Sequence, residues 1–338
     1  MPLLKKSLAA LAALIAAPLP EGLPTVGGQA VMGGVLMRNM GISSLAVRRP
    51  SGEIFVERSG WRSIGSKRLH SIRFVRGFPI LVETLANGIR ALNRSAELST
   101  GGQEERMSRW EVAGTLLLAL GLAVLLFVAA PHFLAWGMER LGMGGGMKSI
   151  AFHAWDGIFK LLIFLAYLAG ISFLPDIRSV FEYHGAEHKS IHAFEQPGTV
   201  SIASARAASR LHPRCGTTFL LFVMCAAIAL HAVLVPALLW VWEPASAWIG
   251  HAGVLLFKVA LIAPVSALAY EMIRASAAMK DGLLRRILCG PGLLLQCLTT
   301  REPDDAQLEV AMEALRGALG EDSPWLDRFE ISSPDSLE

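Results

Sequence analysis

The stretch Tyr183–His192 contains three histidines at intervals of four residues, His184, His188 and His192. On an α-helix this spacing puts the three imidazoles on one face. The first and the last would lie ~12 Å apart along the axis, so one metal ion can take only an adjacent pair. With Glu187 the first pair reads His-x-x-Glu-His, the inverted zinc-peptidase order, in which two histidines bind zinc and the glutamate activates a water. The stretch therefore predicts a divalent metal site, with Zn²⁺ as the metal and Glu187 as general base.

The same spacing has a second interpretation, a polar helix at a membrane surface whose histidines hydrogen-bond to neighbouring segments. A catalytic zinc site needs a third protein ligand and one open position. His212 and Cys215 directly precede a long apolar run, and imidazole and thiolate are both good zinc ligands. We expect one of them to join the site. For Cys215 the alternative is a small buried residue at a helix start.

Three carboxylates are candidates for orienting the metal ligands. Glu271 ends an apolar run, where it would either hold an imidazole in place or pair with Arg274 three residues further on. Asp176 and Glu182 precede the histidines, and we expect them to support the site from outside or to face solvent.

The composition places these residues in an apolar chain. Of its 338 residues, 53% are hydrophobic and 17% are charged, against ~25% charged in a typical soluble domain. The 27 residues between Glu111 and Glu139 contain no Asp, Glu, Lys or Arg, and neither do the 28 between Arg214 and Glu243. Because ~20 apolar residues cross a bilayer core, the sequence predicts an integral membrane protein. It excludes a disordered chain, an ordinary soluble enzyme and a nucleic-acid-binding protein.

The apolar runs predict four transmembrane helices, at residues 112–136, 154–174, 216–240 and 250–271. Basic residues alternate between rich and poor segments: 13 in 38–109, two in 137–153, five in 175–215, none in 241–249 and seven from 274 onward. The positive-inside rule then puts both termini and the histidine-rich segment in the cytoplasm.

The predicted spans contain several polar residues, including Asp156 and Lys160 in the first turns of the second helix. From there Lys160 could extend to the interface. Lys258 is costly at mid-depth, so we expect it to face the other helices. For His231 we expect a hydrogen bond to a neighbouring helix.

The fold class expected is a mainly α membrane protein with about four transmembrane helices, a small cytoplasmic β unit and amphipathic helices. The apolar helix expected in the N-terminal extension is interfacial or buried, in preference to a signal peptide. An amphipathic helix over 72–97 either lies in the membrane interface or packs on the β unit, and another spans 304–319. The domain limits follow in order: an N-terminal extension at 1–26, a β unit with a helix at 27–97, a linker at 98–111, a membrane region at 112–272 that includes the His-rich segment 175–215, and a cytoplasmic C-terminal segment at 273–338.

Several motifs carry a resemblance to a known family: Gly27–Met32, Arg76–Gly77 through Ser95–Glu97, Phe181–Lys189, Leu211–Thr217 and Leu298–Asp305. On these motifs the chain resembles the YqhQ-like family of bacterial membrane proteins, known as domain of unknown function 1385, over about residues 27–320. The resemblance implies the bacterial cytoplasmic membrane and a metal-dependent enzyme, and it brings no substrate. Gly33 stands where the family's first motif carries a glutamate.

The sequence thus favours a membrane metalloenzyme, a hydrolase, whose substrate approaches from the cytoplasmic membrane interface. A lipid-linked molecule or a membrane protein would suit such a site, and membrane lipids would be its surroundings. The alternative is a non-enzymatic metal-binding assembly factor or, less favoured, a carrier. Four protein ligands would indicate the structural role, and three with an open position would indicate catalysis.

Overall fold

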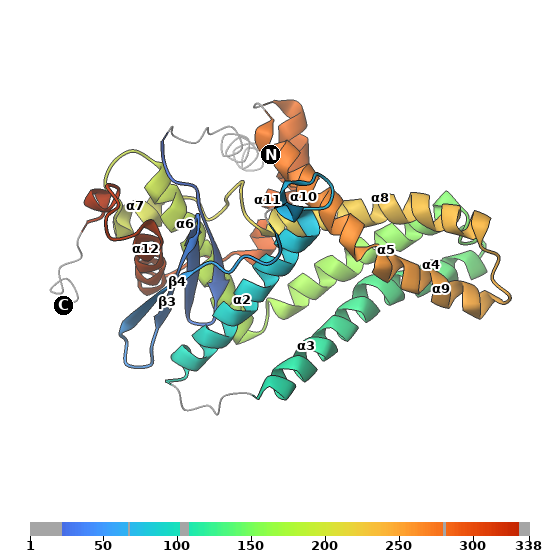
Figure 1. Cartoon of the computed structure of the whole chain (residues 1–338), viewed down its shortest axis with the longest axis horizontal. Coiled ribbons are helices and arrows are strands. Elements are labelled where there is room, and N and C mark those ends of the chain that lie inside the picture. Colours follow the sequence, from blue (N-terminus) through green and yellow to red (C-terminus); the bar gives the residue numbers. More distant parts are fainter. Residues whose placement is uncertain (1–21, 67, 102–107, 280–281, 331–338) are drawn as a thin grey trace, which may run out of the picture.

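The computed structural model describes residues 22–66, 68–101, 108–279 and 282–330. Figure 1 shows a small sheet with helices on both faces at one end and long helices extending from it toward the other end. The expected mainly α fold with a small β unit is confirmed. The apolar helix expected in residues 1–26 falls almost wholly outside the described residues.

The sheet consists of four antiparallel strands in chain order, joined by short turns. Gly33 and Met40 adopt positive φ in the first two turns, where the chain reverses over two residues. The third connection contains the turn expected at Pro50–Gly52. The strands are β1 (Val26–Val31), β2 (Gly34–Asn39), β3 (Ile42–Arg48) and β4 (Ile54–Gly60).

Each face of the sheet is covered by different helices, because apolar side chains alternate along β2 and β3. Leu36 and Leu45 pack toward α2 (Gly77–Ser99), while Met37 and Ala46 pack toward the opposite face. That face is covered by α6 (Pro175–Glu195) and α12 (Asp305–Leu319). Asp304 caps α12 through a capping box, as its sequence predicts.

Helix α2 begins later than its sequence pattern suggests. Phe74 adopts a positive φ of 59°, and the helix starts at Gly77. A side chain at Gly77 would collide with Tyr270, so the glycine permits close packing on a neighbouring helix. Ala91 and Leu98 lie against the sheet. The helix therefore packs on the β unit, which was one of the two alternatives.

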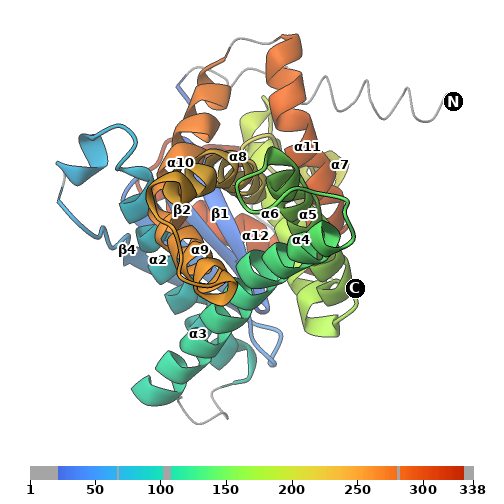
Figure 2. The same cartoon turned by 90° about the vertical axis from the view of Figure 1, so that its right-hand side faces the viewer.

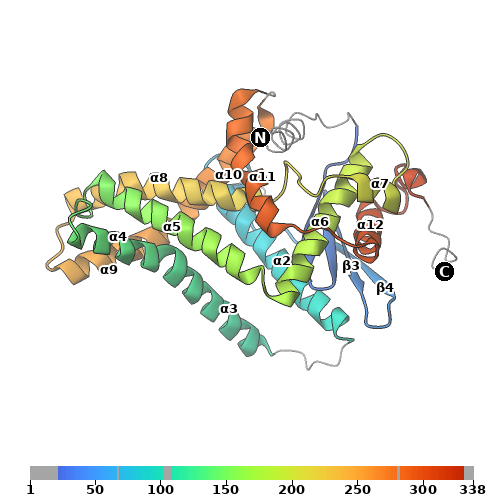
Figure 3. The same ribbon diagram turned by 180° about the vertical axis from the view of Figure 1, so that it is seen from behind.

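The long helices match the four apolar runs. Three are long and apolar enough to cross a membrane within the described residues, and a fourth is a pair bent by 43°. The first span, Trp110–Arg140, has a π-helical turn at its centre. Figure 2 looks along these helices, and Figure 3 shows them from behind. They are α3 (Arg109–Val124), η2 (Leu125–Ala129), α4 (Ala130–Arg140), α5 (Ile150–Ile171), α8 (Thr217–Val241) and the bent pair α9 (Ala247–Ala260) with α10 (Ile262–Ala278).

A buried ionic cluster lies between these apolar helices. Asp156 on α5 accepts hydrogen bonds from Lys160 at 3.2 Å and from Lys258 on α9 at 2.7 Å. Lys160 also contacts His231 Nδ1 at 3.3 Å, which fulfils the expectation for His231. Lys258 faces the other helices, as expected. Lys160 does not extend to the interface, because Asp156 holds it in the interior.

Helix α11 (Leu283–Thr299) is not predicted by the sequence pattern. It contains Pro291 between two glycines, which is typical of a helix break. Gly292 instead lets α11 approach Thr218 on α8 closely. Helices α2 and α3 also reach into the expected linker 98–111 from both sides. The remaining short elements are η1 (Leu69–Ser71), α7 (Ile202–Ala207) and η3 (Leu326–Arg328).

The ionic cluster yields a stability prediction. Asp156→Asn removes the carboxylate charge that two buried lysines share, so we expect the free energy of unfolding in detergent to fall by about 3 kcal/mol. Thermal unfolding of the purified protein measures the change. Asp322→Asn, at an exposed aspartate in the C-terminal described segment, is the matched control. Equal melting temperatures for the two variants would contradict the prediction.

Candidate metal centre

Three potential ligands meet where α6 passes the start of α8. His184 and His188 lie one turn apart on α6, and Cys215 precedes the first residue of α8 by two positions. Their ligand atoms all lie within 4.8 Å of one another. His184 Nε2 is 3.1 Å from Cys215 Sγ. The fold thus brings one of the two candidates for third ligand to the first histidine pair.

Hydrogen bonds to the main chain orient both imidazoles for metal binding. His184 Nδ1 lies 2.8 Å from the carbonyl oxygen of Thr299, and His188 Nδ1 lies 2.5 Å from that of Arg210. A carbonyl oxygen only accepts, so each Nδ1 carries the hydrogen and each Nε2 offers its lone pair. His188 Nε2 is buried with no hydrogen-bond partner among the described residues. Such second-nitrogen hydrogen bonds are typical of metal-binding histidines.

Thr217 makes two polar contacts with the sulfur of Cys215. This sulfur lies 3.2 Å from the Thr217 hydroxyl and 3.4 Å from the Thr217 backbone N–H. Burial raises the pKa of the thiol, whereas the two contacts from Thr217 lower it. A metal ion would favour the thiolate much more strongly than these hydrogen bonds do.

Glu187 lies beside the three ligands in a buried position. The carboxylate lies against the backbone of β1, where a Cβ added at Gly28 would be 2.9 Å from the carboxyl carbon, and its Oε2 has no hydrogen-bond partner among the described residues. Burial raises the pKa of Glu187 to about 8, although nearby His184 lowers it. This oxygen and His188 Nε2 are both buried without a hydrogen-bond partner among the described residues, and their side chains line the same cavity.

A second group, His192, Glu195 and His212, lies next to the first. The Arg214 N–H donates to His212 Nδ1 at 3.3 Å, which leaves the ring hydrogen on Nε2. That Nε2 lies 3.5 Å from Glu195, whose carboxylate also pairs with the Arg214 guanidinium, and it forms no hydrogen bond among the described residues. Burial lowers the pKa of His192 and of His212 to about 4 each.

The sequence predicted His192 and His212 as candidate metal ligands beside His184, His188 and Cys215. It did not predict Glu195. The signal available was its position three residues after His192, on the same helix face. Ring contacts still connect the two groups, since the His188 and His212 rings lie 5.6 Å apart between centroids. The second group therefore lies directly beside the first.

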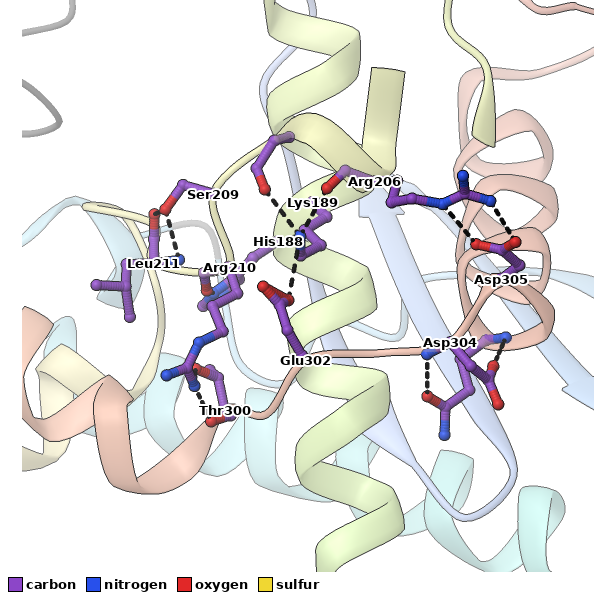
Figure 4. A network of polar contacts seen from close by, with 12 residues as sticks. His188, Lys189, Arg206, Ser209, Arg210, Leu211, Thr300, Glu302, Asp304 and Asp305 are labelled. Atoms are coloured by element: carbon purple, nitrogen blue, oxygen red, sulfur yellow. Dashed lines mark hydrogen bonds and ion pairs between the residues drawn. The ribbon is translucent and has the colours of Figure 1, made fainter. Parts of the chain in front are cut away.

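The segment that carries the Arg210 carbonyl is tied to α6 and to the chain after α11 (Figure 4). Lys189 donates to the carbonyls of Arg206 and Ala208 and pairs with Glu302 at 3.1 Å. The Arg210 guanidinium donates to Thr300. These contacts fix the position of the carbonyl to which His188 donates.

The carboxylates proposed to orient the ligands lie elsewhere. Both oxygens of Glu271 accept from Arg76 at 2.7 Å, so it holds α10 against the start of α2. Arg76 forms the ion pair with Glu271 that was expected for Arg274. Arg274 interacts with Glu271 only through its charge. Glu182 bonds to Arg178 and Gln307, and Asp176 is exposed at the start of α6. The structure brings none of the three to the histidines.

A cavity of about 420 Å³ opens beside the centre. One wall presents Glu187, His188 and Cys215, and another is the backbone of residues 25–29 at the start of β1. Gly33, at the position where the resemblance implies a glutamate, lies in the turn at the far end of β1 against Ser99 and does not line this cavity. A substrate in the cavity would therefore contact the centre without meeting position 33.

Metal binding at this centre should release protons. Because burial raises the pKa of Cys215, its thiol is protonated at neutral pH and must lose the proton to act as a ligand. Zinc affinity should therefore rise with pH, about tenfold per pH unit for each proton released. Competition titrations with a chromophoric chelator at several pH values measure this slope. Cys215→Ala should bind less zinc and show a shallower slope, and an unchanged slope would exclude the thiol as a ligand.

Comparison with known proteins identifies the family. Residues 72–321 match the family described as "Protein of unknown function (DUF1385)". The chain is 32% identical over 310 residues to the uncharacterized protein YqhQ of Bacillus subtilis (strain 168), which covers 88% of this chain and 92% of that protein. No solved structure matches. The resemblance seen in the sequence motifs is confirmed, and the chain belongs to the DUF1385 family.

Proposed function

We propose that this chain is a membrane-bound, metal-dependent hydrolase with one zinc ion held by His184, His188 and Cys215. The observation that supports it most directly is the tautomer of the two histidines, since main-chain carbonyls direct both Nε2 lone pairs toward the cysteine sulfur. Two imidazoles and one thiolate suit Zn²⁺ among the divalent metals. Three protein ligands leave a fourth position for water or substrate.

Glu187 is the proposed general base. When bound, zinc lowers the pKa of water and polarises a carbonyl or phosphoryl oxygen. Glu187 takes the proton from water, and its burial puts its pKa near neutrality, where a base and an acid are both effective. The carboxylate lies against Gly28 of β1, and both residues line the wall of the cavity.

A second candidate rests on the same carboxylate. If Glu187 itself bound the metal, the centre would have four protein ligands and no open position, which is typical of a structural site. The protein would then be a metal-stabilised assembly factor rather than an enzyme. Its unpartnered Oε2 is the observation that favours this reading.

The proposed setting is the bacterial cytoplasmic membrane, with both termini and the metal centre on the cytoplasmic side. Cys215 precedes an apolar helix of 25 residues by two positions, so the centre would lie at the membrane surface. The distribution of basic residues supports this orientation. A substrate attached to the membrane, either a protein segment or a lipid-linked molecule, would reach the site there.

Ligand substitutions test the metal site. We expect His184→Ala, His188→Ala and Cys215→Ala each to lower zinc affinity by about 100-fold or more, because each removes one of three ligands. Elemental analysis of protein purified in detergent measures the bound metal. His192→Ala, on the next turn of the same helix, is the control and should keep it. Loss of zinc from the control alone would transfer the site to the second group.

Substitutions at the proposed base separate the two candidate functions. Glu187→Gln should retain zinc but lower kcat for ester hydrolysis by about 10²–10⁴-fold. Gly28→Ala should also lower kcat, since its Cβ would lie 2.9 Å from the Glu187 carboxyl carbon. Gly27→Ala is the matched control, because nothing lies within 4 Å of the added carbon. Loss of zinc from Glu187→Gln would instead identify Glu187 as a fourth ligand.

A further inference from the structure

Strand β1 forms one edge of the sheet, and the cavity surrounds that edge. Residues from both faces of the sheet line the cavity, with Glu187 on the α6 side and Thr84 and Trp61 on the α2 side. Gly27 and Gly28 between them are exposed. Among the described residues the outer edge of β1 has no strand partner, and it opens into the cavity beside the proposed metal ligands.

The hairpin register shows which backbone groups face the cavity. In a two-residue hairpin the pair that flanks the turn exchanges hydrogen bonds, and the pattern repeats at every second residue. Val31 flanks the turn, so alternate residues down to Gly27 bond to β2. Val26 and Gly28 then direct their N–H and C=O groups to the free edge. Val26 and Gly28 both line the cavity, in agreement with this direction.

The two edges of the sheet differ in their side chains. The opposite edge, β4, carries Glu57 and Arg58, which pair with Arg94 and Glu321. Strand β1 reads Val-Gly-Gly-Gln-Ala-Val, with neither a charge nor a proline. Charged residues and prolines are the features that prevent an exposed edge from pairing with another chain. Strand β1 lacks this protection at the place where the centre lies.

We propose that the substrate is an extended polypeptide segment that adds to the free edge of β1 as a further strand. This inference rests on the hydrolase proposed above and names its substrate class. Backbone hydrogen bonds to Val26 and Gly28 hold the segment, in the manner of other strand-addition complexes. The glycines at 27 and 28 leave the edge free of side chains. Glu187, whose carboxyl lies against the β1 backbone at Gly28, is then next to the backbone of the bound segment.

The reaction is hydrolysis of a peptide bond. The oxygen of a water molecule adds to the scissile carbonyl carbon, and the C–N bond breaks. Glu187 accepts the proton from water and delivers it to the leaving nitrogen, so that the products are a carboxylate and an amine. No oxidant, reductant or further reactant is required.

The first experiment uses the full-length, zinc-loaded protein in lipid nanodiscs, with β-casein as an unfolded polypeptide probe. p-Nitrophenyl acetate and bis(p-nitrophenyl) phosphate serve as small ester probes. We expect β-casein to be cleaved by the wild type and not by Glu187→Gln. Hydrolysis of the esters without cleavage of casein would overturn the polypeptide inference and leave the hydrolase proposal in place. Hydrolysis of no probe by a zinc-loaded protein would overturn both.

The second experiment tests the edge pairing without changing the protein. A peptide that contains a cleavage site from casein is synthesised with one backbone N-methyl group at each position in turn. Because an extended strand directs every second N–H toward β1, kcat/KM should fall by about fivefold or more at alternate positions and stay unchanged between them. Uniform tolerance, or losses without a period of two, would overturn strand addition.

Hydrogen exchange locates the contact on the protein. With zinc-loaded Glu187→Gln and the unmodified peptide, amide exchange should slow in Val26–Val31. The opposite edge, Ile54–Gly60, is the internal control and should exchange as before. Slowing on β4 alone, or on neither edge, would contradict binding at β1.

Discussion

Two hydrogen bonds from imidazoles to main-chain carbonyls determine what the centre can do. They place the hydrogen of His184 and His188 on Nδ1 and so leave Nε2 of each ring to face Cys215. The acceptors belong to Thr299 and Arg210, at the end of α11 and in the loop before α8. The end of α11 and the loop before α8 must therefore both meet α6 before a ligand set exists, and the other contacts of this region hold these two segments there.

Close approach of these segments depends on missing side chains. A Cβ at Gly185 would lie 2.0 Å from the Arg301 carbonyl oxygen, so only glycine lets the chain after α11 cross α6 at this point. Gly28 plays the same part on the other side, where β1 touches Glu187. Both glycines lie within the motifs that carry the family resemblance. Their role is backbone proximity, which places the base and the carbonyl acceptors around the histidines.

Local periodicity in the sequence was enough to predict much of the fold and part of the candidate site. The apolar runs, the α12 cap and the shared face of His184 and His188 all depend on residues close in the chain. The choice between Cys215 and His212 could not be made that way, because it depends on which ring nitrogen a distant carbonyl or N–H engages. Helix α11 and the burial of Lys160 were missed for the same reason, since both depend on distant residues of α8: Thr218 packs against Gly292, and His231 contacts Lys160.

Burial also bears on the proposal that this centre holds a cation. Desolvation lowers the pKa of His188 and raises the pKa values of Cys215 and Glu187, so the protein without a metal would hold these groups neutral. A neutral pocket keeps unused lone pairs on His188 and Glu187 that water in bulk would otherwise satisfy. A divalent ion offsets this cost, because it binds the lone pairs and stabilises the thiolate that burial disfavours. Burial of these groups therefore strengthens the interactions that a bound ion would form with them. The cavity lies on one side of the proposed ligands, and water or a substrate could complete the coordination from that side.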